Sequence, residues 1–338
     1  MKTYNVAVVG AMGIVGREMM RTLEARHFPI GEFRPLDIAE NEGKTVGFNG
    51  KAHTVLEASS ENFKDIDIAI FSAGGAASKA LAPEAVKQGA IVVDNSSEWR
   101  MNPDCPLVVP EVNPEALDGH KGIIANPNCS TIQMLVALKP LHDAAQIKRV
   151  VVSTYQAVSG SGKIALDGLM NEQEQILQQG KVQAAKAYKY PIAFNALAQI
   201  DVFQEGGYTK EEYKMIAETN KIMHDDSIKV TATCVRIPVM YGHSESINIE
   251  TQKKLTADDV RQILSTAQGI KVVDNPEEEL YPMPNQSDTE DLVMVGRIRE
   301  DYTIENGINL WVVANNIRKG AALNAVQIAE TLIKRNLV

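Results

Sequence analysis

The sequence has few cysteines and no long apolar run. Only three of its 338 residues are cysteine, at positions 105, 129 and 234. An odd number of cysteines without metal-ligand spacing argues against a disulfide framework, so we expect reduced thiols, a cytoplasmic location and no bound metal. The sequence contains no run of 18 apolar residues, so we expect no membrane span. The opening segment, MKTYNVAVVGAMG, also lacks the regions of a signal peptide.

The sequence also has no excess of basic residues. Its 34 Lys and Arg are outnumbered by 43 Asp and Glu, which gives a net charge of −9 and no basic cluster. This balance argues against a nucleic-acid partner. The content of 44% hydrophobic and 23% charged residues is that of an ordinary globular protein, and the length suits two domains.

The first part of the sequence alternates short apolar runs with helical patterns. An apolar strand, a glycine-rich turn and an amphipathic helix follow one another within residues 5–28. A second helical pattern covers 78–89, and further strands are expected at 67–73, 90–97, 106–112 and 122–126. Strands buried on both faces that alternate with helices indicate a parallel, doubly wound sheet. We therefore expect a dinucleotide-binding domain over residues 1–128.

The second part of the sequence is richer in long β-patterns. Strands are expected at 149–158, 229–239, 246–254, 291–300 and 307–316, and helices at 162–178, 209–223 and 256–267. This order predicts an α+β domain with a mixed sheet over residues 129–319. A final helix, from about 320 to 338, is expected to pack back onto the first domain.

Three glycines point to a nucleotide site at the first turn. Gly10, Gly13 and Gly16 follow a strand and open a helix, where a tight turn and the helix N-terminus can hold a pyrophosphate. The second expected strand, 32–38, carries Asp37 near its end, where an acidic residue usually binds the adenosine ribose and favours NAD. The alternatives are a purely structural glycine turn and an ordinary turn aspartate.

A cysteine at a helix start is the strongest chemical signal of the sequence. In GIIANPNCSTIQ (122–133), Cys129 follows a strand and precedes a helix, a position that favours a thiolate nucleophile. His243 is expected in a turn between two strands, where it could serve as a base for the sulfur, and Arg236 on the preceding strand could bind an anion. The alternatives are a small buried cysteine, a solvated loop histidine and a salt-bridged arginine.

Five segments together carry a resemblance to a known family. They read ANPNCST, STYQAVSGSG, ETNKIM, CVRIPVMYGHSES and GRIRED, and they occur in order over nearly the whole chain. With this set the sequence resembles bacterial aspartate-semialdehyde dehydrogenases. The resemblance implies a dinucleotide-binding domain joined to a glyceraldehyde-phosphate-dehydrogenase-like domain, and a homodimer or dimer of dimers paired through the latter.

The resemblance also implies a reaction and its site. The reaction is the NADPH-dependent conversion of L-aspartyl 4-phosphate to L-aspartate 4-semialdehyde and phosphate, in the pathway to lysine, diaminopimelate, threonine, methionine and isoleucine. Cys129 is implied as the thioester-forming nucleophile, His243 as the general acid–base, and Gln156 as the residue that orients the substrate at the sulfur. The implied substrate-binding residues are Arg236 for the carboxylate, Glu218 for the amino group, and Arg100, Asn128 and Lys221 for the phosphate. The cofactor-binding positions are Gly10, Met12, Gly13, Ile14, Val15, Gly16, Asp37, Glu40, Ser159, Gly160 and Asn316.

One stretch departs from the family pattern. Related enzymes usually have an arginine-containing RSAGK-like loop after the second strand, whereas this sequence reads DIAENEGKTVGF, with Glu40 at the arginine position and with Gly43 and Lys44 kept. A glutamate repels the 2′-phosphate of NADP, which makes NAD a near second choice of cofactor. NADP stays our first choice, because the resemblance to the whole family outweighs this one loop.

Two other functions remain open at this level. N-acetyl-glutamyl-phosphate reductase performs the same chemistry on a related acyl phosphate, although Glu218 suits the free amino group of an aspartyl substrate better. A non-catalytic dinucleotide sensor is the alternative from another class, and the joint presence of Cys129, Gln156, Arg236 and His243 argues against it.

Overall fold

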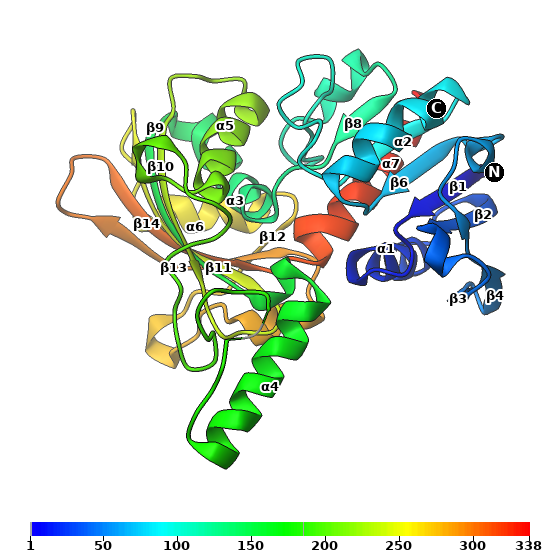
Figure 1. Cartoon of the computed structure of the whole chain (residues 1–338). Helices are drawn as coiled ribbons and strands as arrows, with labels where there is room; N and C mark the ends of the chain where they lie inside the picture. Colours follow the sequence, from blue (N-terminus) through cyan, green and yellow to red (C-terminus); the bar gives the residue numbers. More distant parts are fainter. Residues whose placement is uncertain (1, 185) are drawn as a thin grey trace. The chain divides into compact units, whose positions relative to one another are not determined.

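The structure is a computed structural model that describes residues 2–184 and 186–338. The chain forms two compact units (Figure 1). The first unit contains the residues up to Asn128 together with 321–338, and the second contains Cys129–Gly320. The division along the chain therefore falls directly before Cys129.

The first unit is built on a six-stranded sheet in which every paired strand is parallel. Its strands, in spatial order, are β5 (Leu56–Glu57), β2 (Ile30–Asp37), β1 (Tyr4–Val9), β6 (Ile68–Phe71), β7 (Ile91–Asp94) and β8 (Ile123–Ala125). The chain leaves β1 to form β2 on one side, whereas β6 pairs with β1 on the other side. In doubly wound sheets a ligand binds at such a switch point, outside the carboxyl ends of the strands.

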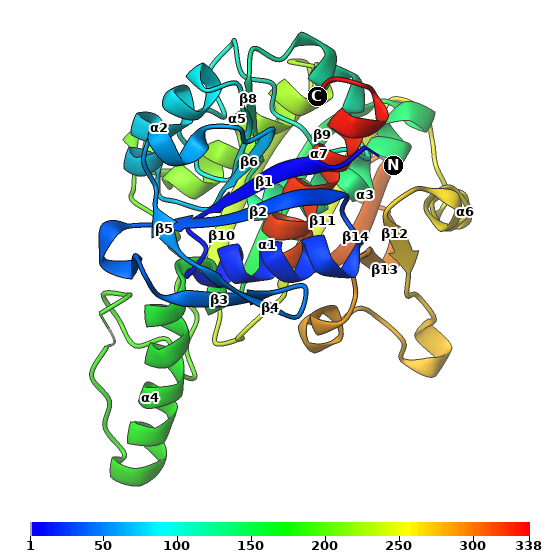
Figure 2. The ribbon, with the colours of Figure 1, turned by 90° about the vertical axis from the view of Figure 1, so that its right-hand side faces the viewer.

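Helices cover both faces of this sheet. On one face α1 (Ile14–Ala25) and the C-terminal helix α7 (Leu323–Lys334) pack against alternate residues of β1 and β6 (Figure 2). On the other face α2 (Gly75–Lys87) packs against the intervening residues. The continuous apolar runs of these strands therefore reflect burial on both sides. A hairpin of β3 (Thr45–Phe48) and β4 (Lys51–Thr54) lies beside the sheet.

One expected strand of the first unit is wrong. Residues 106–112 are largely buried but form only a single bridge, between Leu107 and Ala125. Pro106 and Pro110 have no backbone N–H, and this loss of donors limits the segment to isolated bonds with β8.

The second unit contains a mixed six-stranded sheet. Its strands, in spatial order, are β10 (Lys229–Arg236), β9 (Ile147–Gln156), β11 (His243–Thr251), β14 (Gly307–Ala314), β13 (Val293–Asp301) and β12 (Ile270–Val272). The pairs β10–β9 and β12–β13 are parallel and the other pairs are antiparallel. The two sheet types expected from the sequence are thus confirmed.

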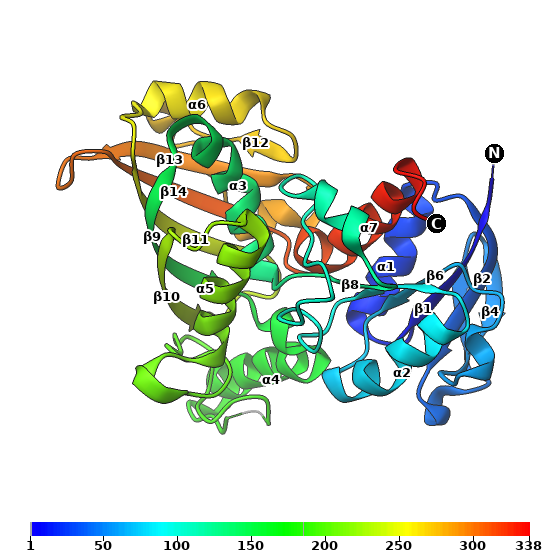
Figure 3. The ribbon, with the colours of Figure 1, turned by 90° about the horizontal axis from the view of Figure 1, so that it is seen from above.

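Three helices form one layer on the mixed sheet. Helix α3 (Cys129–Ala145) packs across the central strands, between α5 (Lys210–Met223), which packs on β10, and α6 (Ala257–Thr266), which packs on β12 and β13 (Figure 3). Helix α4 (Lys163–Gln179) extends away from the sheet (Figure 1). None of the helices formed by the described residues has both the length and the hydrophobicity to cross a bilayer.

Candidate active site

Three polar side chains lie side by side across the mixed sheet. Arg236 of β10 is paired with Gln156 of β9, and the register of β9 with β11 places His243 opposite Gln156 on the other side. All three side chains are buried, with 4%, 1% and 0% of their surfaces exposed. We call Arg236, Gln156 and His243 the polar row. Three buried polar groups at the ends of neighbouring strands are typical of a functional site.

His243 differs from its expected setting. It is the first residue of β11 and fully buried, so the expectation of a turn residue is wrong. Gly242, at a φ of +84°, forms the turn directly before it. The backbone N–H of Ala157 donates to His243 Nδ1 at 3.0 Å. Burial, and to a lesser extent the positive charge of Arg236, hold the pKa of His243 well below its usual value of 6.5. The imidazole is therefore neutral at pH 7 and carries its proton on Nε2.

Cys129 is held close to the polar row by its helix. It is the first residue of α3 and half-buried. Gln133, one turn later on the same helix face, donates from Nε2 to the backbone oxygen of His243 at 3.3 Å. A Cβ atom at Gly320 would lie 2.8 Å from Cys129 Cβ, so a glycine is needed for the close approach of that segment. The helix start that was expected to favour a thiolate is thus fixed over the start of β11.

The other two cysteines have different surroundings. Cys105 and Cys234 are both buried, and burial raises the pKa of the Cys234 thiol far above its usual value. An inert buried thiol is the common state of a structural cysteine. Within the described part of the chain, no three His, Cys, Asp or Glu side chains are grouped as metal ligands.

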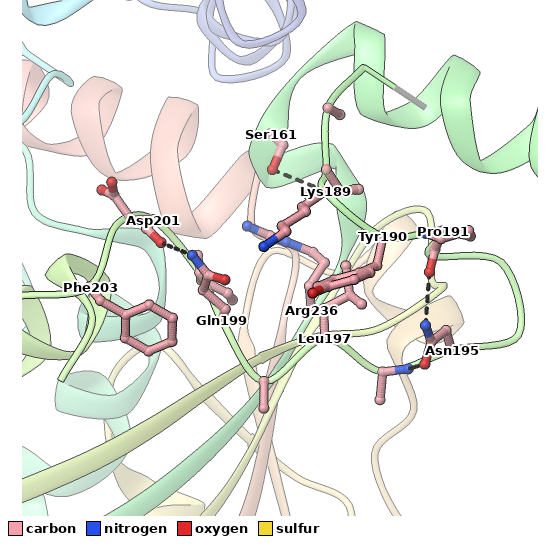
Figure 4. A pocket seen from close by; sticks show the side chains of 15 residues that line it. Ser161, Lys189, Tyr190, Pro191, Asn195, Leu197, Gln199, Asp201, Phe203 and Arg236 are labelled. Atoms are coloured by element: carbon pink, nitrogen blue, oxygen red, sulfur yellow. Dashed lines mark hydrogen bonds between the residues drawn. The ribbon is translucent and has the colours of Figure 1, made fainter. Parts of the chain in front are cut away.

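Arg236 lines a cavity of about 680 Å³ (Figure 4). Its Nη1 donates to the backbone oxygen of Ala157 at 2.6 Å, while its buried Nε has no hydrogen-bond partner among the described residues. Lys189 adds a second cation to the cavity wall, and Asp201 adds an acid. A buried guanidinium with an unused N–H at a cavity wall can bind a carboxylate.

Glu218 and Lys221 lie on α5, which packs on β10 and α3. Glu218 is buried and Lys221, one turn later, is half-buried. Arg100 and Asn128 belong to the first unit and are also buried. Arg100 donates to the backbone oxygens of Asn126 and Asn95, both at 3.0 Å, at the ends of β8 and β7. The predicted roles, binding of the amino group for Glu218 and of the phosphate for Lys221, Arg100 and Asn128, stay predictions.

The glycine turn of the first unit fits a pyrophosphate. Gly10 has a φ of +82°, and a Cβ at Gly16 would lie 2.1 Å from the backbone oxygen of Gly10, so both positions need glycine. Gly13 is the N-cap of α1, and no side chain caps this helix end. Its N–H groups are therefore left for an anion. Met12, Ile14 and Val15 lie on the same turn.

Asp37 has a structural role in addition to the predicted one. Its Oδ2 accepts from the backbone N–H of Met12 at 2.8 Å, and its Oδ1 accepts from Asn41 Nδ2 at 2.7 Å. Lys44 Nζ donates to Asn41 Oδ1 at 2.6 Å and so extends the chain of bonds. The carboxylate thus ties the glycine turn to the loop after β2. Glu40 lies exposed in this loop.

The remaining predicted cofactor residues lie in the second unit, next to the polar row. Asn316 Nδ2 donates to Ser159 Oγ at 2.9 Å, and Asn316 Oδ1 accepts from the backbone N–H of Gly242 at 3.0 Å. A Cβ at Gly160 would lie 3.0 Å from Arg236 Nη1 and 3.5 Å from His243 Nε2. The segment after β9 therefore packs directly on the polar row.

Comparisons with known proteins agree on one family. The family model described as "Semialdehyde dehydrogenase, NAD binding domain" matches residues 5–120, and "Semialdehyde dehydrogenase, dimerisation domain" matches residues 138–319. The aspartate-semialdehyde dehydrogenase of Aquifex aeolicus is 57% identical over 99% of both chains. The chain belongs to the aspartate-semialdehyde dehydrogenase family. It is therefore an oxidoreductase of amino-acid biosynthesis with an NAD(P)-binding domain.

Solved structures of the aspartate-semialdehyde dehydrogenase family have the same fold. Aspartate semialdehyde dehydrogenase II from Vibrio cholerae, complexed with ASA, is 47% identical and superposes with a TM-score of 0.96 over 99% of both chains. The enzyme from Candida albicans, solved with NADP, is 26% identical and has a TM-score of 0.79 over 100% of both chains.

Reasoning from the sequence missed several residues around the polar row. Two of them, Thr154 and Glu211, bond to Gln156, and Gln133 bonds to the backbone of His243. The fourth, Gly320, lies against Cys129. Thr154 could have been found, because residues i and i+2 of a strand share a face, which places it next to Gln156. Gln133 lies one helical turn after Cys129, but its contact with His243 spans 110 residues, and Glu211 and Gly320 come from segments far along the chain.

Proposed function

We propose that this enzyme reduces L-aspartyl 4-phosphate to L-aspartate 4-semialdehyde through a thioester on Cys129. The observation that carries the proposal is the buried polar row beneath the start of α3. A nucleophile at a helix N-terminus, a neutral histidine with Nε2–H, an amide and an unused arginine N–H are the groups that acyl transfer and reduction need. NAD-binding and semialdehyde dehydrogenase family models over the same chain support this function.

Substrate binding follows from the charges of the site. Arg236 binds the α-carboxylate, because its buried guanidinium can make a charge-assisted bond at the cavity wall. The buried carboxylate of Glu218 faces the free amino group, and Lys221, Arg100 and Asn128 bind the phosphate. The complex of the Vibrio cholerae enzyme with ASA supports a small semialdehyde as the product.

The chemistry proceeds in two stages at one carbon. The Cys129 thiolate forms a C–S bond to the acyl carbon, and the C–O bond to phosphate breaks, so that phosphate leaves with the electron pair. When bound, the nicotinamide supplies the hydride that reduces the resulting thioester. The C–S bond of the thiohemiacetal then breaks, which releases the aldehyde and restores the thiolate. His243 stabilises the oxyanion of each stage through Nε2–H and transfers the proton at this atom.

For the cofactor we keep NADP as the first choice and NAD as a near second. NADP in the Candida albicans relative supports the first choice, and Lys44 is the cation of the loop that could face a 2′-phosphate. Glu40 at the arginine position speaks for NAD. Asp37 remains our choice for the adenosine ribose, because a carboxylate that already accepts from Met12 still has lone pairs for a hydroxyl.

We further propose that the enzyme is a cytoplasmic homodimer or dimer of dimers, paired through the second unit. The description of the matching family model as a dimerisation domain supports this. The rings of Tyr155 on β9 and Trp311 on β14 lie next to each other, with their centroids 5.5 Å apart. Both residues are half-buried, and a partner subunit could cover them. Light scattering at micromolar concentration should give at least twice 36.9 kDa, and a monomer would contradict the proposal.

A phosphate-dependent assay tests the function. Formation of NADPH from L-aspartate 4-semialdehyde, phosphate and NADP should be at least about a hundredfold faster than from N-acetyl-glutamate semialdehyde. An acetylated nitrogen carries no positive charge that the Glu218 carboxylate could attract. Glu218→Gln should reduce the ratio of the two rates of NADPH formation. Equal rates with both substrates would favour the reductase alternative, and the absence of turnover with both would favour a non-catalytic sensor.

A further inference from the structure

The side-chain amide of Gln156 is bonded at both ends. Thr154 Oγ1 donates to Gln156 Oε1 at 3.0 Å, and Gln156 Nε2 donates to Glu211 Oε1 at 3.2 Å. Thr154 and Gln156 are buried on the same face of β9, whereas Glu211 comes from the first turn of α5. The contacts therefore join two elements around one amide.

The surroundings leave the amide only one orientation. Lys214 Nζ lies 3.1 Å from Glu211 Oε2 and 3.0 Å from Asp201 Oδ2, so Glu211 is an ion-paired carboxylate and only accepts hydrogen bonds. A rotated amide would place the Gln156 oxygen against this carboxylate. The Thr154 hydroxyl supports this orientation, because it donates to the oxygen at the opposite end.

The fixed amide lies beside the imidazole of the polar row. Gln156 Nε2 and His243 Nε2 are 3.4 Å apart. Since Ala157 donates to Nδ1, His243 carries its hydrogen on Nε2, and the Gln156 nitrogen also carries hydrogens. Neither nitrogen can accept from the other. One N–H of Gln156 is used by Glu211, so each nitrogen keeps one hydrogen for an acceptor from outside the row.

We propose that Thr154 and Glu211 are positioning residues that hold the Gln156 amide so that its second N–H and the His243 Nε2–H form a two-donor site for the substrate oxyanion. This inference rests on the proposed function, because it needs an acyl carbon on Cys129. Two preorganised donors stabilise the charge that develops in the transition state, at no reorganisation cost. Thr154 and Glu211 each bond to one end of the Gln156 amide, so we expect their effect on the reaction to pass through Gln156.

A double-mutant cycle tests the inference. Thr154→Val keeps the shape and removes the hydroxyl, and Thr154→Ser keeps the hydroxyl. Each variant is made in the wild-type and in the Gln156→Ala background, and kcat and KM for the semialdehyde are measured with the melting temperature. We expect Thr154→Val to lower kcat by about tenfold to a hundredfold with little change in KM, and Thr154→Ser to stay within about threefold.

In the Gln156→Ala background Thr154→Val should change kcat by no more than about twofold, because the amide that it holds is gone. Equal losses in both backgrounds would overturn the inference, and so would a loss in wild type that Thr154→Ser does not restore. Failure of the proposed function is distinguishable, because it would appear as a Gln156→Ala single variant with unchanged turnover. A normal melting temperature for Thr154→Val excludes a folding defect, and Glu211→Gln, which keeps a neutral acceptor, should give a smaller loss of kcat than Thr154→Val.

Discussion

The backbone N–H of Ala157 lies 3.0 Å from Nδ1 of His243 and donates to it. A backbone N–H can only donate, so the imidazole keeps its lone pair at Nδ1 and its proton at Nε2. The ring thus begins the reaction as a hydrogen-bond donor. In the proposed mechanism we therefore expect the start of α3 to favour the thiolate form of Cys129.

The first prediction concerns the pH dependence of turnover. Burial and Arg236 lower the pKa of His243, so the ring stays neutral at and above pH 6.5 and gains a proton only well below it. The kcat/KM of the wild type should therefore show no loss from His243 between pH 8 and 6.5. His243→Asn should lower kcat by roughly 10² to 10⁴ at pH 7. An acid limb centred near pH 6.5 or above that disappears in His243→Asn would contradict this.

The second prediction concerns the glycine that lies against the polar row. A methyl group at position 160 would lie 3.0 Å from Arg236 Nη1 and 3.5 Å from His243 Nε2, so Gly160→Ala should displace both side chains. We expect kcat/KM to fall by about tenfold to a hundredfold, with a small change in melting temperature. Gly47→Ala, where a methyl group meets nothing within 4 Å, is the control. Equal activity of the two variants would show that the contact has no effect.

The third prediction concerns a buried acid next to His243 on β11. Burial raises the pKa of Glu245 well above its usual value of 4.5, although the nearby Gln133 amide opposes the shift. In the unfolded chain the Glu245 carboxyl loses its proton near pH 4.5, whereas in the folded chain it keeps the proton to a higher pH. The contribution of Glu245 to the free energy of unfolding is therefore highest below pH 4.5 and falls as the pH rises toward the folded pKa. Glu245→Gln removes this loss.

The free energy of unfolding from urea titrations at pH 5, 6, 7 and 8 measures the effect. Relative to wild type, Glu245→Gln should gain up to about 1.4 kcal/mol for each pH unit above 4.5 until the folded pKa is reached. Glu250→Gln is the matched control on the same strand, because Glu250 is ion-paired with Lys148 at 2.5 Å and half-buried. A difference between Glu245→Gln and wild type that stays constant with pH would contradict the account.

The sequence was most informative where burial follows the period of an element. The strands expected at 149–158 and 229–239 correspond to β9 and β10, because their alternation of buried and exposed residues matches a sheet covered on one face. The prediction of a strand at 106–112 was wrong, because the apolar run suggested a strand but the prolines prevent regular pairing. His243 was misplaced by one residue, because the turn ends at Gly242.

The candidate site could be found from the sequence only in part. Cys129 and the glycine turn carry local signals, namely a thiol at a helix start and a strand–turn–helix. The contact between Gln156 and Glu211 spans 55 residues, and the contact between Gln133 and His243 spans 110. Such contacts depend on how α3 and α5 pack on the sheet. Asp37 shows a further limit, because a motif assigns it a ligand but does not reveal the bond to Met12.

The fourth prediction concerns the choice of cofactor. Glu40 is exposed in the loop after β2, where Lys44 and Asn41 continue the bonds of Asp37. Removing a negative charge near the 2′-phosphate and adding a positive one should favour NADP by roughly tenfold to several hundredfold. We therefore expect Glu40→Arg to raise the kcat/KM for NADP relative to NAD by that factor. Glu61→Arg, the same charge change at another exposed glutamate of this unit, should have no such effect.

A wild type that already prefers NADP several hundredfold and is unchanged by Glu40→Arg would show that Glu40 does not face the phosphate. In that case Lys44 alone would explain the preference, and Lys44→Ala should then reduce it.

The covalent intermediate on Cys129 tests the central claim most directly. The enzyme is mixed with L-aspartyl 4-phosphate without NADPH, quenched in acid and digested, and the peptides are analysed by mass spectrometry. We expect an aspartyl thioester on the peptide that contains Cys129, none on those with the buried Cys105 or Cys234, and its loss on addition of NADPH. Cys129→Ala should have no turnover, and Cys105→Ala and Cys234→Ala should remain active. An adduct at another residue, or a Cys129→Ala variant within about tenfold of wild-type kcat, would contradict the mechanism.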